Sequence, residues 1–267
     1  MARNRGTAAP PAGPPAAEQP PGLAMADPVT HTRSSSVGFL LDSLRRRKAG
    51  RVVLSLLTVV LFLAGVGLFT YPFFTDLYTK HVRQRSLAEE FQRIDVTSFE
   101  DWETQVAPGR PLTRLIIPAL GVDTLVVEGT SPDALRAGAG HYPNTPLPGQ
   151  PGNVAIAGHR TTYGKPFNEL DTLEQGDVVW LATPIGDYRY EVTAPPEGWS
   201  SNPFITTPTD WRVIEQSSLP MLTLTTCHPK GSAAQRLVVR ADLAESMPPG
   251  SADGEIAAAR AAAAQDS

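Results

Sequence analysis

The feature that most constrains this chain is an uncharged, apolar run of 23 residues from Val52 to Phe74. At about 1.5 Å of rise per residue, a helix over this run is long enough to cross a hydrocarbon layer of roughly 30 Å. A buried core helix is seldom free of charge over such a length, and a cleaved signal peptide is shorter and begins nearer the N-terminus. The sequence therefore predicts a transmembrane helix over residues 52–74 and, because no second apolar run follows, a single-pass protein.

Charge is distributed unevenly on the two sides of this run. The formal net charge of −4 combines 8 basic and 3 acidic side chains in residues 1–75 with 15 basic and 24 acidic ones in residues 76–267. Five basic residues directly precede the apolar run: Arg45, Arg46, Arg47, Lys48 and Arg51. Positively charged flanks stay in the cytoplasm, so we expect a cytoplasmic N-terminus and an extracytoplasmic C-terminal portion at the cell membrane. The near-neutral total argues against nucleic acid as a partner.

Three segments flank the membrane run and the main folded region. Residues 1–36 are rich in Pro, Ala and Ser and bury too little apolar surface to fold. With the basic cluster that follows, residues 1–51 are predicted to form a disordered, basic cytoplasmic tail. Residues 75–109 are charged and helical in pattern, with Glu89 and Arg93 spaced as a surface pair, and predict an extracytoplasmic stalk helix and linker. Residues 247–267 are small and polar, and we expect a disordered C-terminal tail.

Residues 110–246 contain short apolar, β-branched runs separated by Gly and Pro. Seven or eight such runs over about 135 residues are typical of a β-barrel or sandwich. The predicted strands include Leu115–Ile117, Thr124–Val127, Val154–Ala157, Val178–Leu181, Arg189–Val192, Met221–Thr225 and Leu237–Val239. A short helix is predicted after Ser131, a favourable N-cap, with Pro132 in its first turn and Gly138 ending it. A further helical turn is expected over residues 210–214.

The chain has one cysteine, Cys227, which excludes an intramolecular disulfide. It stands at the end of an apolar, β-branched run and directly before a turn, a position that holds a side chain rigidly beside a cleft. A lone cysteine is often a small buried hydrophobe. An unpaired thiol outside the membrane is, however, exposed to oxidation, so its presence in a chain that otherwise avoids cysteine favours a chemical role.

A nucleophilic thiol needs a proton partner. The five histidines are His31, His81, His141, His159 and His228. The first two fall in the tail or beside the membrane, and His228 is adjacent to Cys227, so it points to the opposite face of a strand. His141 lies in a Gly/Pro loop, where a loop hydrogen bond is the commoner role. His159 follows a short apolar strand that ends in Gly158, and we predict it as the partner.

An oxyanion needs a hydrogen-bond donor, and Arg236 opens the strand that follows the turn after Cys227. A hairpin at this place brings Arg236 alongside Cys227. Arg240 shares its face at period two but lies about 13 Å further along the strand. An arginine at the rim of a site is more often solvated than catalytic, so this signal is informative only together with His159 and Cys227.

Taken together, these motifs resemble the sortases, the membrane-anchored cysteine transpeptidases of Gram-positive cell surfaces. The matching segments are Asn153–Arg160 (NVAIAGHR), Thr223–Cys227 (TLTTC) and Arg236–Val239 (RLVV), with Gly140–Pro143 and Pro148–Asn153 approaching the histidine strand. The resemblance covers roughly residues 110–244. The run from Gly158 to Gly164 (GHRTTYG), with the anchor at the N-terminal side, is most similar to the class E sortases of actinobacteria.

The resemblance implies a sortase-like closed β-barrel of seven to eight strands with short helices, preceded by a single transmembrane helix. It implies that Cys227 attacks the Thr–Gly carbonyl of a LAXTG- or LPXTG-type sorting signal and forms a thioacyl intermediate. His159 would protonate the leaving amine and then deprotonate an incoming amine of the cell wall. Arg236 would stabilise the oxyanion or anchor the signal peptide.

Two further residues are implied in substrate binding. Tyr142 resembles a tyrosine that is associated with the choice of LAXTG, and Thr226 neighbours the nucleophile. The segment from Trp199 to Trp211 would wall the substrate groove. The expected partners are secreted proteins with a C-terminal sorting signal and a peptidoglycan precursor or cross-bridge amine. No acidic cluster of the calcium-binding kind is apparent, so we expect neither a metal nor a cofactor.

Two alternatives stay open from the residues themselves. A surface cysteine peptidase would use the same three side chains and would pass the thioacyl group to water. A membrane-tethered β-domain that binds surface peptides without catalysis is the other, and the joint presence of His159, Cys227 and Arg236 disfavours it.

Overall fold

The computed structural model describes residues 48–265, so the tail predicted for residues 1–47 lies outside the described part of the chain. The first element is a long helix that consists of α2 (Lys48–Tyr78), a π-helical turn η1 (Thr79–Arg83) and α3 (Gln84–Phe91). Residues 48–51, predicted as the end of the tail, form the first turn of α2. From Phe62 onward, this helix and the β-domain belong to one folded unit.

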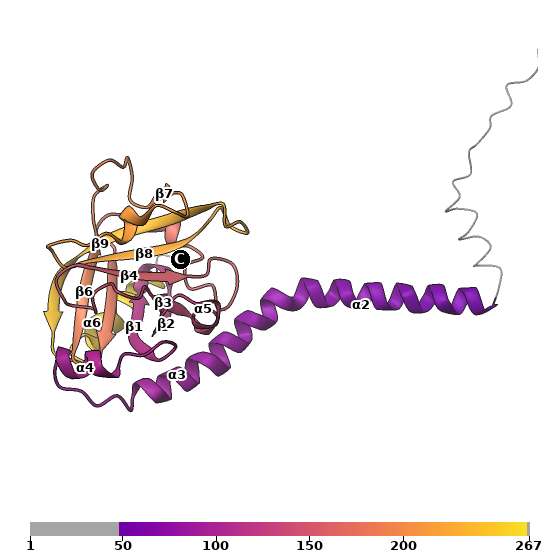
Figure 1. Ribbon diagram of the computed structural model, residues 1–267, viewed down its shortest axis with the longest axis horizontal. Coiled ribbons are helices and arrows are strands. Elements are labelled where there is room, and N and C mark those ends of the chain that lie inside the picture. The colour runs from indigo at the N-terminus through magenta and orange to yellow at the C-terminus, as the bar shows by residue number, and fades with distance from the viewer. Residues whose placement is uncertain (1–47, 266–267) are drawn as a thin grey trace, which may run out of the picture. The chain divides into compact units, whose positions relative to one another are not determined.

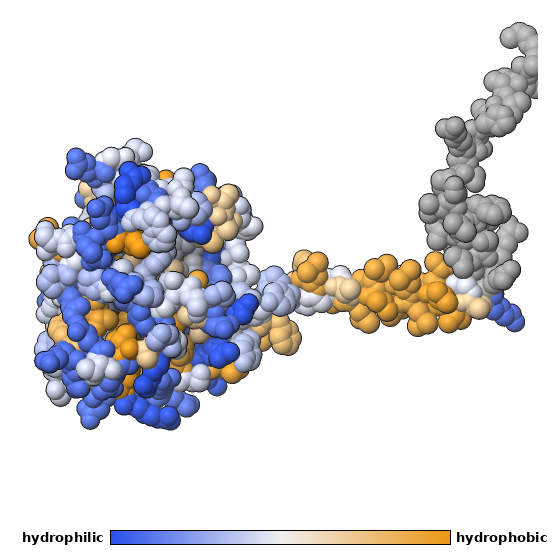
Figure 2. All heavy atoms as spheres, viewed as in Figure 1, coloured by the Kyte–Doolittle hydropathy of each residue, from blue (hydrophilic) through white to orange (hydrophobic). Residues whose placement is uncertain are grey.

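The apolar run lies within α2, and its side chains are exposed. Leu68 is 80% exposed and Phe62 is 67% exposed, and apolar residues cover the visible face of this helix (Figure 2). Among residues 48–265, one helix is both long enough and apolar enough to cross a membrane, and it is this one. Since lipid would cover such side chains, the helix is compatible with the predicted single-pass anchor.

The β-domain is a closed barrel of eight strands with a ninth added at its side (Figure 1). The strands are β1 (Pro111–Ile117), β2 (Val122–Glu128), β3 (Ala139–His141), β4 (Asn153–Gly158), β5 (Val178–Thr183), β6 (Gly186–Val192), β7 (Phe204–Thr206), β8 (Met221–His228) and β9 (Gln235–Met247). They follow the order β6-β5-β1-β2-β3-β4-β8-β9-β7, and a second pairing of the long β9 with β6 closes the barrel. The predicted barrel of seven to eight strands is confirmed.

All seven predicted strands are present, whereas β3 and β7 were not predicted. Both have only three residues, too few for an alternating pattern to be read from the sequence. Strand β3 pairs in parallel with β2 and antiparallel with β4, and β7 pairs with the first part of β9.

Short helical segments connect the strands. They are α4 (Phe99–Gln105), η2 (Pro118–Leu120), α5 (Pro132–Ala137), η3 (Leu170–Thr172) and η4 (Trp211–Ile214). The predicted cap of α5 is confirmed, because the hydroxyl of Ser131 accepts a hydrogen bond from the Ala134 N–H at 3.2 Å. The helical turn predicted over residues 210–214 is η4, and the Asp210 carboxylate accepts from the Arg212 N–H at its start. The surface pair Glu89–Arg93 is also present, at 3.9 Å.

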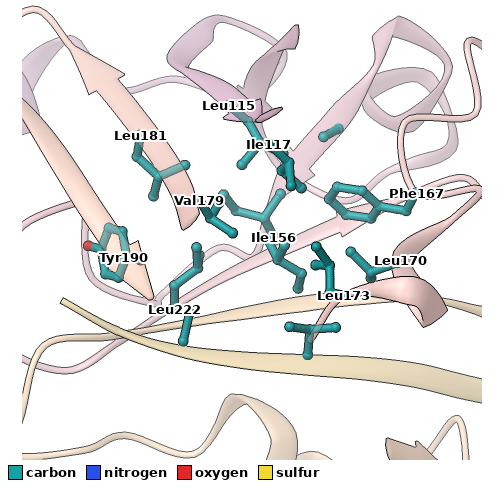
Figure 3. Close-up of a cluster of buried hydrophobic side chains, with 14 of the residues drawn as sticks. Leu115, Ile117, Ile156, Phe167, Leu170, Leu173, Val179, Leu181, Tyr190 and Leu222 are labelled. Atoms are coloured by element: carbon teal, nitrogen blue, oxygen red, sulfur yellow. The ribbon is translucent and has the colours of Figure 1, made fainter. Parts of the chain in front are cut away.

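The core fills the barrel interior and fixes the strands that matter for the site. Ile156 of β4 and Leu222 of β8 meet Leu181 and Tyr190 from the opposite wall (Figure 3). All six residues of β4 are buried. The segment after β4 is also pinned to this core, because Phe167 is fully buried there and packs so close to Gly158 that no Cβ would fit.

The C-terminal segment corrects one prediction. Residues 247–267 were expected to be disordered, but α6 (Asp253–Ala263) follows β9 and packs on the barrel. Ile256 and Ala252 are buried against Ile116 and Trp180. In the sequence, a stretch of alanines with one isoleucine appeared to lack a docking face. Ile116 and Trp180 lie outside the central core cluster, however, and form an apolar surface that Ile256 covers. The folded domain therefore extends beyond residue 246.

Candidate active site

The predicted histidine and cysteine lie at the ends of two adjacent parallel strands. Strands β4 and β8 pair in parallel with Ala157 opposite Thr225, so His159 and Cys227, each two residues further on, lie at the same edge of the sheet. Parallel neighbours bring their carboxyl ends together, which explains why residues far apart in the sequence meet here.

The pleat places both side chains on the outer face of the barrel. Ile156 and Leu224 belong to the core cluster. Because side chains alternate along a strand, the residues three positions further on face outward, and these are His159 and Cys227. Cys227 has a free thiol and is half-buried. The thiol and the imidazole therefore share one face of the sheet.

Arg236 joins them through the β8–β9 hairpin. It pairs directly with Cys227 in the antiparallel register, as the hairpin argument predicted. Its neighbour Leu237 lies in the core cluster, so Arg236 faces outward with the thiol. The Arg236 guanidinium donates to the carbonyls of Ala233 and Gln235, both at 3.0 Å, and so packs against the hairpin turn. The structure thus brings all three predicted residues to one end of the barrel.

The imidazole of His159 is half-buried, and its surroundings favour the neutral form. Its pKa is lowered below the ordinary value, first by burial, which disfavours charge, and second by the positive charge of Arg136. The ring of Tyr163 lies against it, with centroids 5.0 Å apart and planes tilted by 42°. A neutral imidazole at neutral pH is able to take a proton from a thiol.

Thr226 occupies the inner face of β8, not the outer one. Its buried hydroxyl donates to the carbonyl of Gly158 at 2.8 Å. This bond ties the end of β8 to the end of β4. Thr226 therefore holds the strand ends of His159 and Cys227 together, and its side chain is turned away from the face predicted to bind substrate.

Tyr142 lies over the outer face of the barrel, next to Thr225, which is two residues before Cys227 on β8. Its hydroxyl is 3.0 Å from the hydroxyl of Thr225, which is two residues before Cys227 and on the same face. The distance between those positions along a strand is about 6.6 Å. The segment after β6 covers the same face further along, where Phe204 packs with Val238 in a small apolar cluster.

Arg160 is a residue of the site that the sequence reasoning missed. Its side chain is buried, only 2% exposed, and pairs with the Asp171 carboxylate at 2.8 Å. The same guanidinium donates to Nδ1 of His228 at 2.9 Å and reaches the carbonyl of Cys227 at 3.4 Å. Because a guanidinium only donates, His228 accepts at Nδ1 there. The alternation that excluded His228 as the proton partner also indicated that Arg160 would lie beside it.

His141 has a structural role, as its alternative interpretation predicted. It ends β3 and is buried, with Nδ1 2.6 Å from a carboxylate oxygen of Glu128 and Nε2 3.0 Å from the Pro146 carbonyl. These bonds fix the loop that leads to β4. Within residues 48–265, no group of three or more His, Cys, Asp or Glu side chains is placed to hold a metal ion.

Comparisons with known proteins define the class. A sequence model of the sortase domain matches residues 115–244. The SrtF sortase from Corynebacterium diphtheriae is 30% identical, with a TM-score of 0.52, over 63% of this chain and 97% of that chain. Sortase A of Bacillus anthracis is 26% identical over 72% of this chain and 94% of that protein. Sortase SrtE1 of Streptomyces coelicolor is 28% identical over 76% of this chain, which spans 61% of that protein.

The chain belongs to the sortase family. It is accordingly a sortase-type cysteine transpeptidase, built on the closed barrel described above. The Streptomyces relative agrees with the predicted likeness to actinobacterial class E sortases.

Proposed function

We propose that this sortase is a membrane-anchored enzyme that cleaves a LAXTG- or LPXTG-type sorting signal between Thr and Gly and joins the Thr carbonyl to a cell-wall amine. The observation that supports this best is the meeting of His159, Cys227 and Arg236 on one outer face at one end of the barrel. These are the parts that acyl transfer requires: a nucleophile, a proton carrier and an oxyanion donor.

In the first half-reaction, the sulfur of Cys227 bonds to the threonine carbonyl carbon, and the thiol proton passes to His159. The oxyanion that forms collapses, and the bond between that carbon and the glycine nitrogen breaks. His159 gives the proton to the departing nitrogen. The lowered pKa of His159, caused by burial and by Arg136, suits an imidazole that begins this step without the proton.

In the second half-reaction, an amine of the cell wall attacks the thioester carbon and its bond to Cys227 breaks. His159 removes a proton from the amine and returns it to the thiolate. Arg236 acts in both halves by donating to the carbonyl oxygen as negative charge develops. Its contacts with Ala233 and Gln235 both use Nη1, and a guanidinium has further N–H donors on Nε and Nη2.

The signal peptide would lie along the outer face of β8 towards Tyr142. Tyr142 and the segment Trp199–Trp211 border this face from opposite sides, which supports their assignment to substrate binding. The assignment of Thr226 to substrate binding is weaker, because its side chain is on the inner face and its hydroxyl bonds Gly158.

The proposed location is the cell membrane, with one membrane-spanning helix, a cytoplasmic N-terminus and an extracytoplasmic barrel. The support is the exposed apolar surface of α2 and the basic residues that precede it in the sequence. The substrates would then be secreted proteins that carry the sorting signal, and the acceptor would be a peptidoglycan precursor or cross-bridge amine.

The test uses the full chain in detergent micelles, with LAXTG and LPXTG peptides, with and without an amino-glycine acceptor. Mass spectrometry follows the thioacyl enzyme, the amide product and the hydrolysed acid. We expect an amide product that depends on the acceptor, is greater for LAXTG, and is absent in Cys227→Ala.

Each rival function gives a different result in this assay. Hydrolysis alone at saturating acceptor would identify a peptidase. Peptide binding without any thioacyl enzyme would identify a non-catalytic binding domain. Turnover that persists in Cys227→Ala would contradict the proposed mechanism altogether.

A further inference from the structure

A turn with an unusual backbone follows the site histidine. Three consecutive residues have positive φ, namely Tyr163 at 53°, Gly164 at 79° and Lys165 at 40°. Left-handed backbone is uncommon for residues other than glycine and persists only where neighbouring structure holds it. The first of these residues carries the ring that lies against His159. The position of this turn therefore bears directly on the imidazole.

The end of the anchor helix holds this turn. The Asp76 carboxylate accepts a hydrogen bond from the Gly164 N–H at 2.9 Å, and its other oxygen is 3.8 Å from the Lys165 ammonium. The Asp76 side chain is only 17% exposed, so these contacts are partly shielded from water. Five residues earlier on α2, the hydroxyl of Tyr71 lies 3.0 Å from the hydroxyl of Tyr163.

The same helix also holds α5, whose Arg136 lies over the Tyr163 ring and lowers the pKa of His159. The hydroxyl of Thr79 donates to the carbonyl of Arg136 at 3.1 Å, and Thr79 is buried. The Gln84 amide donates to the carbonyl of Ala137 at 2.6 Å. Arg136 lies over the Tyr163 ring, with 6.0 Å to its centroid. One helix therefore contacts both segments whose side chains surround His159.

The helix is irregular at the place where these contacts are made. Residues Thr79–Arg83 form a π-helical turn between α2 and α3. Such turns are rare and are frequently found at functional sites. If residues 52–74 span the membrane, Asp76 and Thr79 lie immediately outside it, so the contacts with the turn and with α5 are made at the membrane surface.

We propose that Asp76 and Thr79 are positioning residues of the transpeptidase, which hold the segments that carry Tyr163 and Arg136 in place around His159. This inference rests on the catalytic role proposed for His159. The anchor helix then does more than retain the enzyme at the membrane, because its first turns outside the membrane complete the surroundings of the catalytic imidazole.

The test compares Asp76→Ala, Asp76→Asn and Thr79→Val in the full chain in micelles. Asparagine keeps an oxygen that accepts from the Gly164 N–H, whereas alanine does not. Glu89→Ala is the matched control, because Glu89 lies on the same continuous helix in an exposed pair with Arg93. We expect kcat to fall about tenfold in Asp76→Ala with little change in KM, since small misplacements of catalytic groups are costly. Asp76→Asn should recover most of the rate.

Two further readouts separate positioning from loss of folding. The Gly164 amide should exchange its hydrogen faster in Asp76→Ala while the melting temperature stays near that of the parent. The titration of His159, followed by NMR in the Cys227→Ala background, should move to higher pH as the ring gains water. Arg136 of α5 lowers the pKa of this ring and Tyr163 of the turn lies against it. Arg236 of β9 and, in the parent chain, Cys227 of β8 share its outer face.

The possible results are distinct. Unchanged kcat and unchanged His159 titration in Asp76→Ala would overturn the inference, even where His159→Ala is inactive and the proposed function stands. A parent chain without transpeptidation would overturn the proposed function. The NMR titration and the Gly164 exchange rate would then still decide whether Asp76 positions the histidine.

Discussion

Two histidine-containing pairs lie one residue apart at the same strand ends, and they differ in almost every property. On the outer face, His159 and Cys227 are half-buried, and the thiol is free. On the inner face, Arg160 is buried, bonds His228 and Asp171, and reaches the backbone carbonyl of Cys227. The alternation of a β-strand therefore separates the groups that we propose to react from the groups that hold them.

Residue type alone does not distinguish His159, the histidine that we propose to react, from His228. His228 is nearer to Cys227 in sequence than His159 is, but it points to the inner face and accepts a hydrogen bond from Arg160. The outer face leaves the thiol of Cys227 free, whereas on the inner face His228 is held by a hydrogen bond from Arg160.

The first prediction contrasts the two histidines. His159→Ala should lower kcat/KM by about 10²–10⁴, the usual contribution of a general acid–base group. His228→Ala should lower it by less than about tenfold, because His228 supports the site only through Arg160. Peptide transpeptidation assays on both variants measure this. Equal losses would show that the two faces do not divide the chemistry in this way.

The second prediction concerns the outer-face arginines. Arg236→Ala should reduce kcat by about 10²–10³, as for loss of one oxyanion donor, while Arg236→Lys recovers part of the rate. Arg240 is the control, since it is on the same face of β9 but is paired with Thr223 rather than with Cys227. Steady-state kinetics should show a loss of less than about fivefold in Arg240→Ala. A larger loss there would place the substrate further along β9 than proposed.

The third prediction concerns the inner face. Arg160→Met should destabilise the fold by about 1–3 kcal/mol, because it leaves the half-buried acceptor of His228 and the carboxylate of Asp171 without their donor. Thermal unfolding and denaturant titration measure this loss. In the fraction that remains folded, kcat should fall because the end of β8 is less firmly held. Full stability in this variant would mean that the inner pair does not hold the site.

Much of this division was predictable from sequence, and the reasons are local. The apolar runs gave the strand ends, and period-two alternation excluded His228. The hairpin predicted after Cys227, and not the alternation, is what placed Arg236 beside it, and the observed register pairs the two residues directly. Helix α5 was predictable for a similar reason, because its N-cap Ser131 and the Gly138 that ends it are directly adjacent to it in the sequence.

What was missed depends on contacts between distant segments. Arg160 takes its role only because the loop after β4 folds back and places the Asp171 carboxylate beside the Arg160 guanidinium. No local sequence pattern indicates that this loop folds back. The helix α6 was taken for a tail because its docking surface, Ile116 and Trp180, belongs to other strands. The contact of Asp76 with Gly164 joins residues 88 positions apart.

The fourth prediction is a pH dependence set by the outer face. The pKa of His159 is lowered by burial and, to a smaller degree, by Arg136, so its proton-accepting form persists below pH 6.5, the usual pKa of histidine. The acid limb of kcat/KM should therefore lie below pH 6.5. Removing the charge in Arg136→Ala should move that limb upward, towards 6.5 but not beyond it, because burial remains. A limb that moves downward would contradict this account of the charge.

The smallest effect is expected for an ion pair on the surface of the barrel, Arg260 with Asp123, which contacts none of the site residues and serves as a reference for the other variants. Arg260 of α6 bonds the Asp123 carboxylate at 2.7 Å, and Arg114 bonds the same carboxylate. These side chains are about one-third exposed, and surface ion pairs of this kind contribute at most about 1 kcal/mol. Arg260→Ala should therefore lower the unfolding free energy by less than that, as denaturant titration measures, and should leave kcat unchanged. A loss of activity in Arg260→Ala would show that any destabilisation of the barrel impairs the site. The effects of the other variants would then not distinguish the outer face from the inner face.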